Sequence, residues 1–277
     1  MEIGCNLSSF RRYGEKRYLK MKEIGFNYVD IGVRGLKEGE TQDELDAFYV
    51  QEKALADAAG VQVYQVHAPF IFPPQDRTPE QREERFVTLV QSMRAALLLG
   101  AENWVVHPML PYYGMEDELY LAESHKINVD FFRRLLPKAK EMGLTICFEN
   151  TASSKTRFVT PEETLSIIKE IDDESLRMCL DTGHCVHMGT WSAGEAVRQA
   201  GSYLHAFHIH DSTGYHHDDP LFPFFGRVDW HDFYLALGEV GYDGVLCLET
   251  GPSPKLSDKA FEAALKAMYL IANDILR

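Results

Sequence analysis

Six short apolar runs in this chain each end on a residue whose side chain can bind a metal ion. The end residues lie 40, 42, 32, 27 and 41 positions apart, and this interval fits one strand plus one helix. Such spacing is typical of a parallel α/β barrel, in which every strand ends on the same face. The spacing therefore predicts that six distant side chains meet in one pocket: His67, His107, Glu149, Asp181, His208 and Glu249.

Glycines mark the ends of helices in the same repeating unit. Five times a helical stretch closes on Gly and an apolar strand follows, because Gly readily adopts the left-handed cap that other residues resist. Parallel strands that are buried on both faces also read as continuous apolar runs. The pattern indicates repeated βα units, and the five glycines are Gly25, Gly60, Gly100, Gly143 and Gly241.

The whole pattern predicts a single (β/α)8 TIM barrel that fills residues 1–277 as one domain. No linker and no low-complexity tract interrupts it. The predicted strands are 2–7, 27–32, 61–67, 103–107, 144–149, 176–181, 204–209 and 244–249. The predicted helices are 15–24, 42–59, 79–99, 119–142, 161–170, 193–200, 230–240 and 258–275.

Charge and composition exclude several classes of protein. The net charge is −14, with 28 basic against 42 acidic residues, which argues against a nucleic-acid partner. No apolar run is long enough to cross a membrane, and the first residues read as a strand rather than a signal peptide. The five cysteines show no paired spacing, so we expect reduced, buried thiols in a cytoplasmic protein.

Four of the six end residues form an oxygen-rich set of metal ligands. Glu149, Asp181, His208 and Glu249 close the fifth to the eighth predicted strands. Three carboxylates and one imidazole suit Mn²⁺, Co²⁺ or Mg²⁺, and Zn²⁺ is also accommodated. Without a cation, three buried carboxylates would repel one another and raise each other's pKa values. The sequence therefore predicts one divalent metal ion held by these four residues.

Three histidines form a second group of candidates. His67 and His107 close the third and fourth predicted strands, beside Glu149 in barrel order. They could hold a second metal ion bridged by Glu149, or they could hydrogen-bond the hydroxyl groups of a substrate. His184 follows in an Asp-Thr-Gly-His run and is expected to touch substrate or water. Both interpretations of the first two histidines stay open.

Further residues are candidates for substrate binding. His210 shares a strand face with His208 because side chains alternate along a strand, so it should lie near the pocket. Trp104 is a candidate apolar wall for a bound substrate. Arg157 and Lys155, like Arg11 and Arg12 after the first strand, could hold a phosphate or a carboxylate, although no Gly-rich phosphate cradle accompanies them.

These residues resemble the xylose isomerase-like barrel superfamily, which contains sugar isomerases, ketose 3-epimerases, inosose dehydratase and endonuclease IV. The resemblance covers almost the whole chain. Its most specific pieces are His67-Ala-Pro69, His107-Pro108, Phe148-Glu149-Asn150, Leu180-Asp181-Thr-Gly-His184, His208-Ile-His-Asp211, Gly226-Arg-Val-Asp229-Trp230 and Leu248-Glu249.

The resemblance to the epimerase branch implies roles for particular residues. There, the positions matching Glu149, Asp181, His208 and Glu249 bind one divalent ion. The two glutamates also act as the acid–base pair, and the position matching His184 contacts the substrate. Phe158-Val-Thr-Pro-Glu-Glu163 likewise looks like the sugar isomerase/epimerase branch.

Endonuclease IV is similar too, and there the positions matching His67, His107 and His184 belong to a trinuclear zinc site. That enzyme also needs an Asp-x-His run after the seventh strand. Aligned from Gly226, this chain reads Asp218-Asp219-Pro220 there, without the His. A shifted gap would bring His216 or His217 into that position.

The predicted function is a metal-dependent isomerase or epimerase that acts on a sugar or sugar phosphate. The metal would stabilise an enediolate as a Lewis acid, while Glu149 removes a carbon-bound proton and Glu249 returns one. Three alternatives remain: a phosphodiesterase on abasic DNA, a lyase like inosose dehydratase, and a metal-binding protein without turnover. A homo-oligomer is expected from the barrel type.

Overall fold

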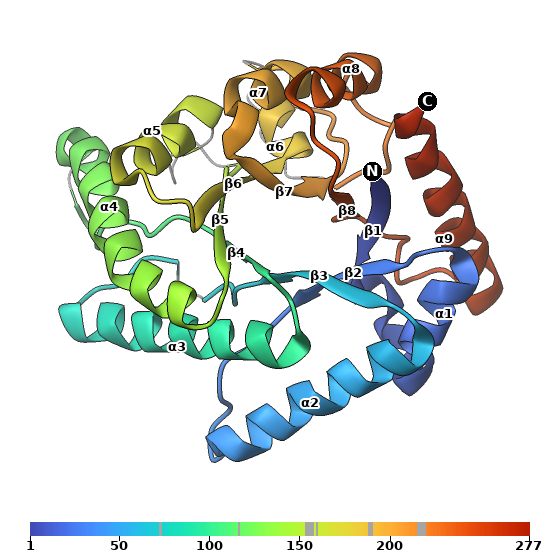
Figure 1. The fold of residues 1–277 in the computed structure, drawn as a ribbon, viewed down its shortest axis with the longest axis horizontal. Coiled ribbons are helices and arrows are strands. Elements are labelled where there is room, and N and C mark those ends of the chain that lie inside the picture. The colour runs from blue at the N-terminus through green and yellow to red at the C-terminus, as the bar shows by residue number, and fades with distance from the viewer. Residues whose placement is uncertain (72–73, 116, 153–157, 159, 188–190, 215–219) are drawn as a thin grey trace.

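Eight parallel strands close into a barrel in the computed structural model (Figure 1), which describes residues 1–71, 74–115, 117–152, 158, 160–187, 191–214 and 220–277. Each strand pairs with its neighbours in chain order, and β1 pairs with β8. The predicted (β/α)8 TIM barrel is confirmed. The strands are β1 (Glu2–Asn6), β2 (Tyr28–Gly32), β3 (Gln62–His67), β4 (Asn103–Val106), β5 (Thr145–Glu149), β6 (Leu176–Asp181), β7 (Leu204–Ile209) and β8 (Val245–Leu248).

Helices surround the barrel and cover its outer face (Figure 1). Several begin on a Ser or Thr whose hydroxyl accepts a backbone N–H, such as Thr41 and Thr160, and these satisfy donors that a helix start leaves unpaired. Gly60 and Gly100 end helices in the left-handed conformation, as predicted. The helices are α1 (Arg17–Ile24), α2 (Gln42–Ala59), α3 (Pro79–Leu99), α4 (Asp117–Glu141), α5 (Pro161–Ile171), α6 (Thr182–His187), α7 (Ala193–Ala200), α8 (Trp230–Val240) and α9 (Asp258–Asn273), with short 3-10 segments η1 (Leu7–Lys16), η2 (Gly201–Tyr203) and η3 (Asp274–Leu276).

Two elements depart from the predicted series of eight helices. The segment η1 replaces a loop between the first strand and the first helix, and α6 follows β6 directly. Six residues are too few for an apolar period to show in a sequence, so α6 could not be recognised there. The strands β4 and β8 also end one residue early, so His107 and Glu249 lie just beyond them.

Side-chain alternation along the strands sets up the pocket. Val105, Cys147, Cys179 and Ala206 form a small fully buried cluster. Side chains two positions further along a strand share its face. The residues at those positions are His107, Glu149, Asp181 and His208, so an apolar layer underlies the predicted site.

A register shift aligns β7 with β6. Met178 pairs with Leu204, but Cys179 pairs with Ala206, so His205 is an extra residue in β7. Beyond this bulge, Asp181 pairs with His208. Bulges often re-aim side chains next to functional sites, and here the bulge puts two predicted ligands side by side.

Within the described part of the chain, no helix is both long and apolar enough to cross a membrane. The five cysteines are all buried and free, as the sequence predicted. Burial raises the pKa of the Cys147 thiol to about 12, so it stays protonated beneath the pocket.

Candidate metal centre

The four predicted metal ligands come together at the carboxyl end of the barrel. One ligand atom from each of Glu149, Asp181, His208 and Glu249 lies within 4.8 Å of all the others. His208 is at the centre of this donor set, with its Nδ1 2.8 Å from Glu149 Oε1 and 3.1 Å from Glu249 Oε2. Glu149, Asp181 and His208 are fully buried. Four strands that are separate in the sequence thus supply one donor set.

The two glutamates of the site differ in their electrostatic environment. Burial opposes ionisation of Glu149, but the charges of His208 and His107 and the hydrogen bond from His208 outweigh it and hold its pKa well below the usual range. Burial raises the pKa of Glu249, and the negative charge of Glu149 adds to this rise against the opposing effect of His208. Environments that push two carboxyl pKa values apart are a mark of acid–base pairs.

The Oε2 atom of Glu149 supplies an independent test of fit for a cation. It lies 3.3 Å from His67 Nε2 and 3.1 Å from His107 Nε2, yet it has no hydrogen-bond partner of acceptable geometry. A buried carboxylate oxygen without a hydrogen bond is unfavourable unless a cation neutralises it. The three carboxylates and the imidazole nitrogens around it suit a divalent ion. The residues present therefore fit a metal ion.

His67 and His107 lie against the metal ligands, as the sequence predicted for them. The two rings meet edge to face at 4.8 Å, and His67 stacks on His208 at 5.3 Å. Nδ1 of His67 is 2.6 Å from the carbonyl oxygen of Ala68, to which it must donate, so Nε2 is directed to Glu149. Burial would lower the pKa of His67, but the adjacent carboxylate of Glu149 raises it to about 9.

Asn150 holds the backbone of Asp181. Its amide nitrogen donates to the Asp181 carbonyl oxygen at 3.2 Å, and its amide oxygen accepts from the Asp181 backbone N–H at 2.8 Å. Asp181 in turn accepts the backbone N–H of His184 at 2.8 Å, which caps the short helix α6. His184 Nδ1 donates to the Asn150 carbonyl oxygen at 2.9 Å. This network fixes Asp181 and His184 relative to each other.

His210 forms an ion pair with Asp181. Its Nε2 lies 3.0 Å from Asp181 Oδ1, and its Nδ1 lies 3.0 Å from the carbonyl oxygen of Asp211. Burial would lower the pKa of His210, but the charge of Asp181 raises it to about 9. Both nitrogens therefore carry hydrogen at neutral pH. The structure places His210 beside the ligands, as predicted, with its ring engaged by protein groups.

Sequence reasoning missed Asp30, a fully buried residue of β2. Its Oδ2 lies 3.2 Å from His208 Nε2 and accepts a hydrogen bond from Asn6 Nδ2 at 3.1 Å. A charged residue in the middle of an apolar strand was the available signal, since acidic side chains are almost never buried without a partner. Asp30 lies in the middle of β2, whereas the predicted ligands all come from the ends of strands.

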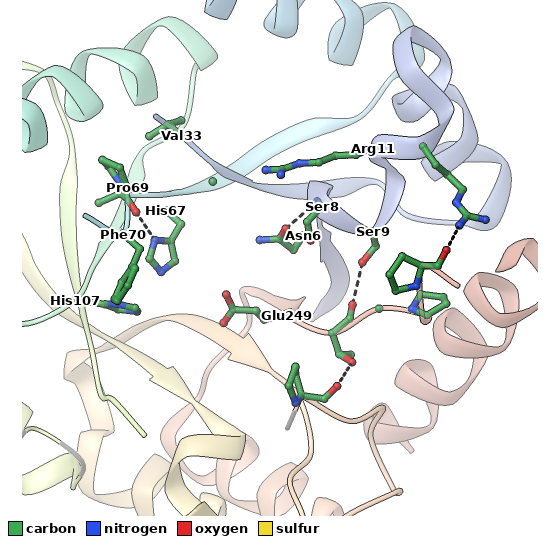
Figure 2. A pocket seen from close by; sticks show the side chains of 18 of the residues that line it. Asn6, Ser8, Ser9, Arg11, Val33, His67, Pro69, Phe70, His107 and Glu249 are labelled. Carbon is green, nitrogen blue, oxygen red and sulfur yellow. Dashed lines mark hydrogen bonds between the residues drawn. The ribbon is translucent and has the colours of Figure 1, made fainter. Parts of the chain in front are cut away.

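A pocket of about 790 Å³ borders the donor set at Glu249 (Figure 2). Glu249, His67 and His107 form part of its lining, and the β1–η1 connection and the segment after β8 supply other walls. His107 is one-third exposed, whereas Glu149 behind it is fully buried. The volume can hold a monosaccharide-sized ligand in contact with the metal-binding face.

Two other predictions for the pocket have different outcomes. Trp104 as a pocket wall is wrong: the side chain is fully buried, and its indole N–H donates to Ser92 Oγ of α3 at 3.0 Å. The Trp104 side chain points outward from β4 and packs between the sheet and α3. Arg157 lies outside the described residues, as do Lys155, His216 and His217.

Comparison with known proteins agrees with this architecture. An uncharacterised protein of Methanocaldococcus jannaschii is 30% identical over 194 residues, which is 66% of this chain and 63% of that protein. The D-psicose 3-epimerase of Agrobacterium fabrum is 29% identical over 129 residues, 46% of this chain and 42% of the enzyme. The chain therefore covers less than two thirds of the length of either relative.

A solved structure and a family profile extend the match to nearly the whole chain. The crystal structure of a D-tagatose 3-epimerase-like protein is 25% identical with a TM-score of 0.75, covering 100% of both chains. The profile described as xylose isomerase-like TIM barrel matches residues 19–268. On this match, the chain belongs to the xylose isomerase-like TIM-barrel family.

Proposed function

We propose that this protein is a divalent-metal-dependent isomerase or epimerase of a ketose sugar or its phosphate. The observation that carries the proposal is the convergence of three carboxylates and one imidazole within 4.8 Å, next to a pocket large enough for a monosaccharide. The names of two relatives, a D-psicose 3-epimerase and a D-tagatose 3-epimerase-like protein, support the same substrate class.

The proposed chemistry is proton transfer at a carbon next to a carbonyl group. A divalent ion, when bound by Glu149, Asp181, His208 and Glu249, supplies Lewis acidity toward the carbonyl oxygen of the sugar. Glu149, whose pKa is depressed, is the base that removes the carbon-bound proton. Glu249, which lines the pocket, returns a proton to the substrate. Return to the other face of the same carbon gives the epimer, and return to the neighbouring carbon gives the aldose.

His67 and His107 are assigned to substrate contact in this proposal. Both line the pocket. Elemental analysis tests the assignment, because substrate-binding histidines leave a stoichiometry of one ion per chain. Two or three tightly bound zinc ions, together with cleavage of an abasic duplex, would favour the phosphodiesterase instead.

Exchange of substrate hydrogen with solvent tests the acid–base pair. Glu149→Gln and Glu249→Gln should each lower deuterium incorporation from D₂O into a ketose by at least about 10²-fold, the usual contribution of a positioned acid or base. Glu52→Gln removes a buried carboxylate that pairs with Arg17 and Tyr18 away from the pocket, so it serves as the control. Full exchange in either active-site variant contradicts the assignment.

Screening ketoses and their phosphates with the wild-type protein distinguishes an epimerase from a lyase and from a binding protein without turnover. An epimerase incorporates deuterium at one carbon and yields an isomeric sugar, whereas a lyase releases water and yields a dehydrated product. A binding protein without turnover gives saturable binding and no deuterium. The five buried free cysteines support a reducing, cytoplasmic setting for this activity.

A further inference from the structure

Asp30 is a buried carboxylate whose position needs a physical reason. It is fully buried in β2, and its Oδ1 has no hydrogen-bond partner among the described residues. Burial of a charged group is costly unless partners compensate it. Its Oδ2 faces two such partners, Asn6 Nδ2 at 3.1 Å and His208 Nε2 at 3.2 Å.

The two ring nitrogens of His208 therefore face different carboxylates. Nδ1 faces the carboxylates of Glu149 and Glu249, and Nε2 faces Asp30. Asp30 Oδ2 already accepts a hydrogen bond from Asn6 Nδ2, so it acts as an acceptor toward His208 as well, and the Nε2 beside it carries the hydrogen. A neutral imidazole has one N–H, which leaves the Nδ1 lone pair available toward the metal-binding face.

We infer that Asp30 is a positioning residue that fixes both the ring orientation and the tautomer of His208, so that Nδ1 is the metal-binding nitrogen. Asn6 from the adjacent strand β1 holds the Asp30 carboxylate in place through its amide. A carboxylate behind a ligating histidine also makes the ring a stronger ligand. The inference depends on metal binding by His208, and not on which sugar reaction follows.

Metal affinity of the stripped protein tests this role without any substrate. Asp30→Asn keeps the size of the side chain and removes its charge. Competitive titration with Mn²⁺ or Zn²⁺ should show a ten- to hundredfold weaker Kd, the usual effect of losing such a partner. Asn6→Ala, which removes the support of Asp30 and the cap on the Ser8 backbone N–H but keeps the Asp30 carboxylate, should weaken the Kd less. Glu52→Gln, the loss of a buried carboxylate elsewhere, should leave the Kd unchanged.

The nitrogen chemical shifts of His208 supply a readout that a merely structural role would not move. In the zinc-loaded wild-type protein, ¹⁵N NMR should show Nδ1 bound to metal and Nε2 carrying a slowly exchanging hydrogen. In Asp30→Asn, that hydrogen should exchange faster with water. Metal binding through Nε2, or an unchanged Kd in folded Asp30→Asn, would overturn the inference. If Asp30→Ala fails to fold, the isosteric variant still decides the question.

Arg11 carries an independent inference about the substrate. Figure 2 shows its side chain extending into the pocket from η1, on a different wall from His67 and His107. Its guanidinium forms no ion pair or hydrogen bond with the residues that the structure describes. The next residue, Arg12, is committed elsewhere: it donates to the Pro254 carbonyl oxygen at 2.9 Å and stacks on Phe261.

We also infer that Arg11 binds an oxyanion, a phosphate ester or a carboxylate, on the part of the sugar that lies away from the metal. This rests on the proposed function for the identity of the sugar. Arginine binds both oxyanions through two parallel N–H bonds, so the two sources share one chemistry. Once a metal ion offsets the acidic donor set, a guanidinium without a partner makes this pocket selective for an anionic ligand.

Paired substrates test the anion site. A ketohexose, its 6-phosphate and its 6-carboxylate are compared in the wild-type protein and in Arg11→Gln. The ratio of kcat/KM for the preferred anion to that for the neutral ketose should fall about 10- to 100-fold in the variant, the loss of one or two charge-assisted hydrogen bonds. Lys16→Gln, a charge loss in the same segment outside the pocket lining, should not change this ratio.

Binding without turnover separates this inference from the proposed reaction. Calorimetry with inorganic phosphate should show weaker binding to Arg11→Gln than to the wild-type protein. If no sugar is turned over but phosphate binding still depends on Arg11, the anion site stands and the reaction fails. If ketoses are turned over with no preference for an anion and no effect of Arg11→Gln, the reaction stands and the anion site is wrong.

Discussion

At the scale of single residues, the glycine of the Asp-Thr-Gly-His run is required by a packing contact with His210. Gly183 has an ordinary backbone conformation, so a turn does not require glycine there. A Cβ at this position would lie 2.0 Å from Cε1 of His210, which is closer than atoms can approach. The absence of a side chain lets the His210 ring pack beside Asp181. Gly183 thus shapes the site through a ring that it touches.

Gly183→Ala should therefore displace His210 and disturb its ion pair with Asp181. The displaced core ring should cost about 1–3 kcal/mol in the free energy of unfolding, measured by urea titration. Gly238→Ala in α8 is the control, because a Cβ there meets no atom within 4 Å. Alanine at such a helical position should instead stabilise the protein slightly. Equal stability of the two variants would rule out this explanation of Gly183.

The residues at strand ends were predictable because a residue type and a spacing suffice to find them. Asp30 was not, because its partner His208 lies 178 positions away and on a strand that is not adjacent to β2. Such a contact across the barrel depends on strand tilt and stagger, which no local pattern encodes. The prediction that Trp104 lines the pocket was wrong for a simpler reason. The face of a strand on which a side chain lies depends on the register of that strand.

At the scale of elements, one side chain joins the end of β7 to the start of α8. The buried Asp211 accepts backbone N–H groups from Ser212 at 2.9 Å and from Val228 at 3.0 Å. Its other oxygen accepts the indole N–H of Trp230 at 3.0 Å. Gly226 packs directly on this carboxylate, where a Cβ would lie 2.3 Å from Oδ1. The resemblance motifs ending in Asp211 and Trp230 thus share one structural role.

Asp211→Ala should leave three buried donors without an acceptor. We expect a loss of at least about 3 kcal/mol in the free energy of unfolding, since each unsatisfied donor costs about 1–3 kcal/mol. Asp229→Ala removes only the N-terminal cap of α8 and should cost about 1 kcal/mol. Thermal unfolding of both variants measures the difference, and equal losses would show that Asp211 does not organise this connection.

At the scale of the whole molecule, the barrel was predictable because its repeat is written in the sequence several times. Continuous apolar runs, glycine caps and intervals of 27 to 42 residues all indicate the same unit, and the caps at Gly60 and Gly100 adopt the expected conformation. The exceptions are short. The helix α6 and the segment η1 depend on local capping and packing, which a periodicity over two turns cannot reveal.

Removal of metal should change the pH dependence of stability of the entire fold. The pKa values of His67 and His210 are raised from 6.5 to about 9 in the folded chain. Their stabilisation is therefore fully present below pH 6.5 and is lost as the pH rises through about 9. With metal removed by EDTA, Tm should fall between pH 7 and pH 9, and Glu149→Gln should flatten the part due to His67. A rising Tm across that range would contradict these shifts.

Metal binding should reverse that trend. Ligands must lose their protons before an ion binds, and burial of His208 is outweighed by the carboxylates of Glu149 and Glu249, which raise its pKa well above the usual value. The apparent affinity for Mn²⁺ should therefore increase from pH 6 to pH 8, and the stabilisation by a fixed excess of Mn²⁺ should increase with it. Tm measured with and without the ion at each pH checks this expectation.

The register shift in β7 limits how this donor set could be transplanted into another barrel. If β7 paired with β6 without this shift, the same sequence would set Phe207 rather than His208 opposite Asp181. β3 has a similar shift, where Tyr64 is passed over and Gln65 pairs with Asp30. A designer who copies only the ligands onto regular strands would turn the imidazole outward. The register shifts in β3 and β7 are therefore as necessary to the donor set as the metal-binding residues themselves.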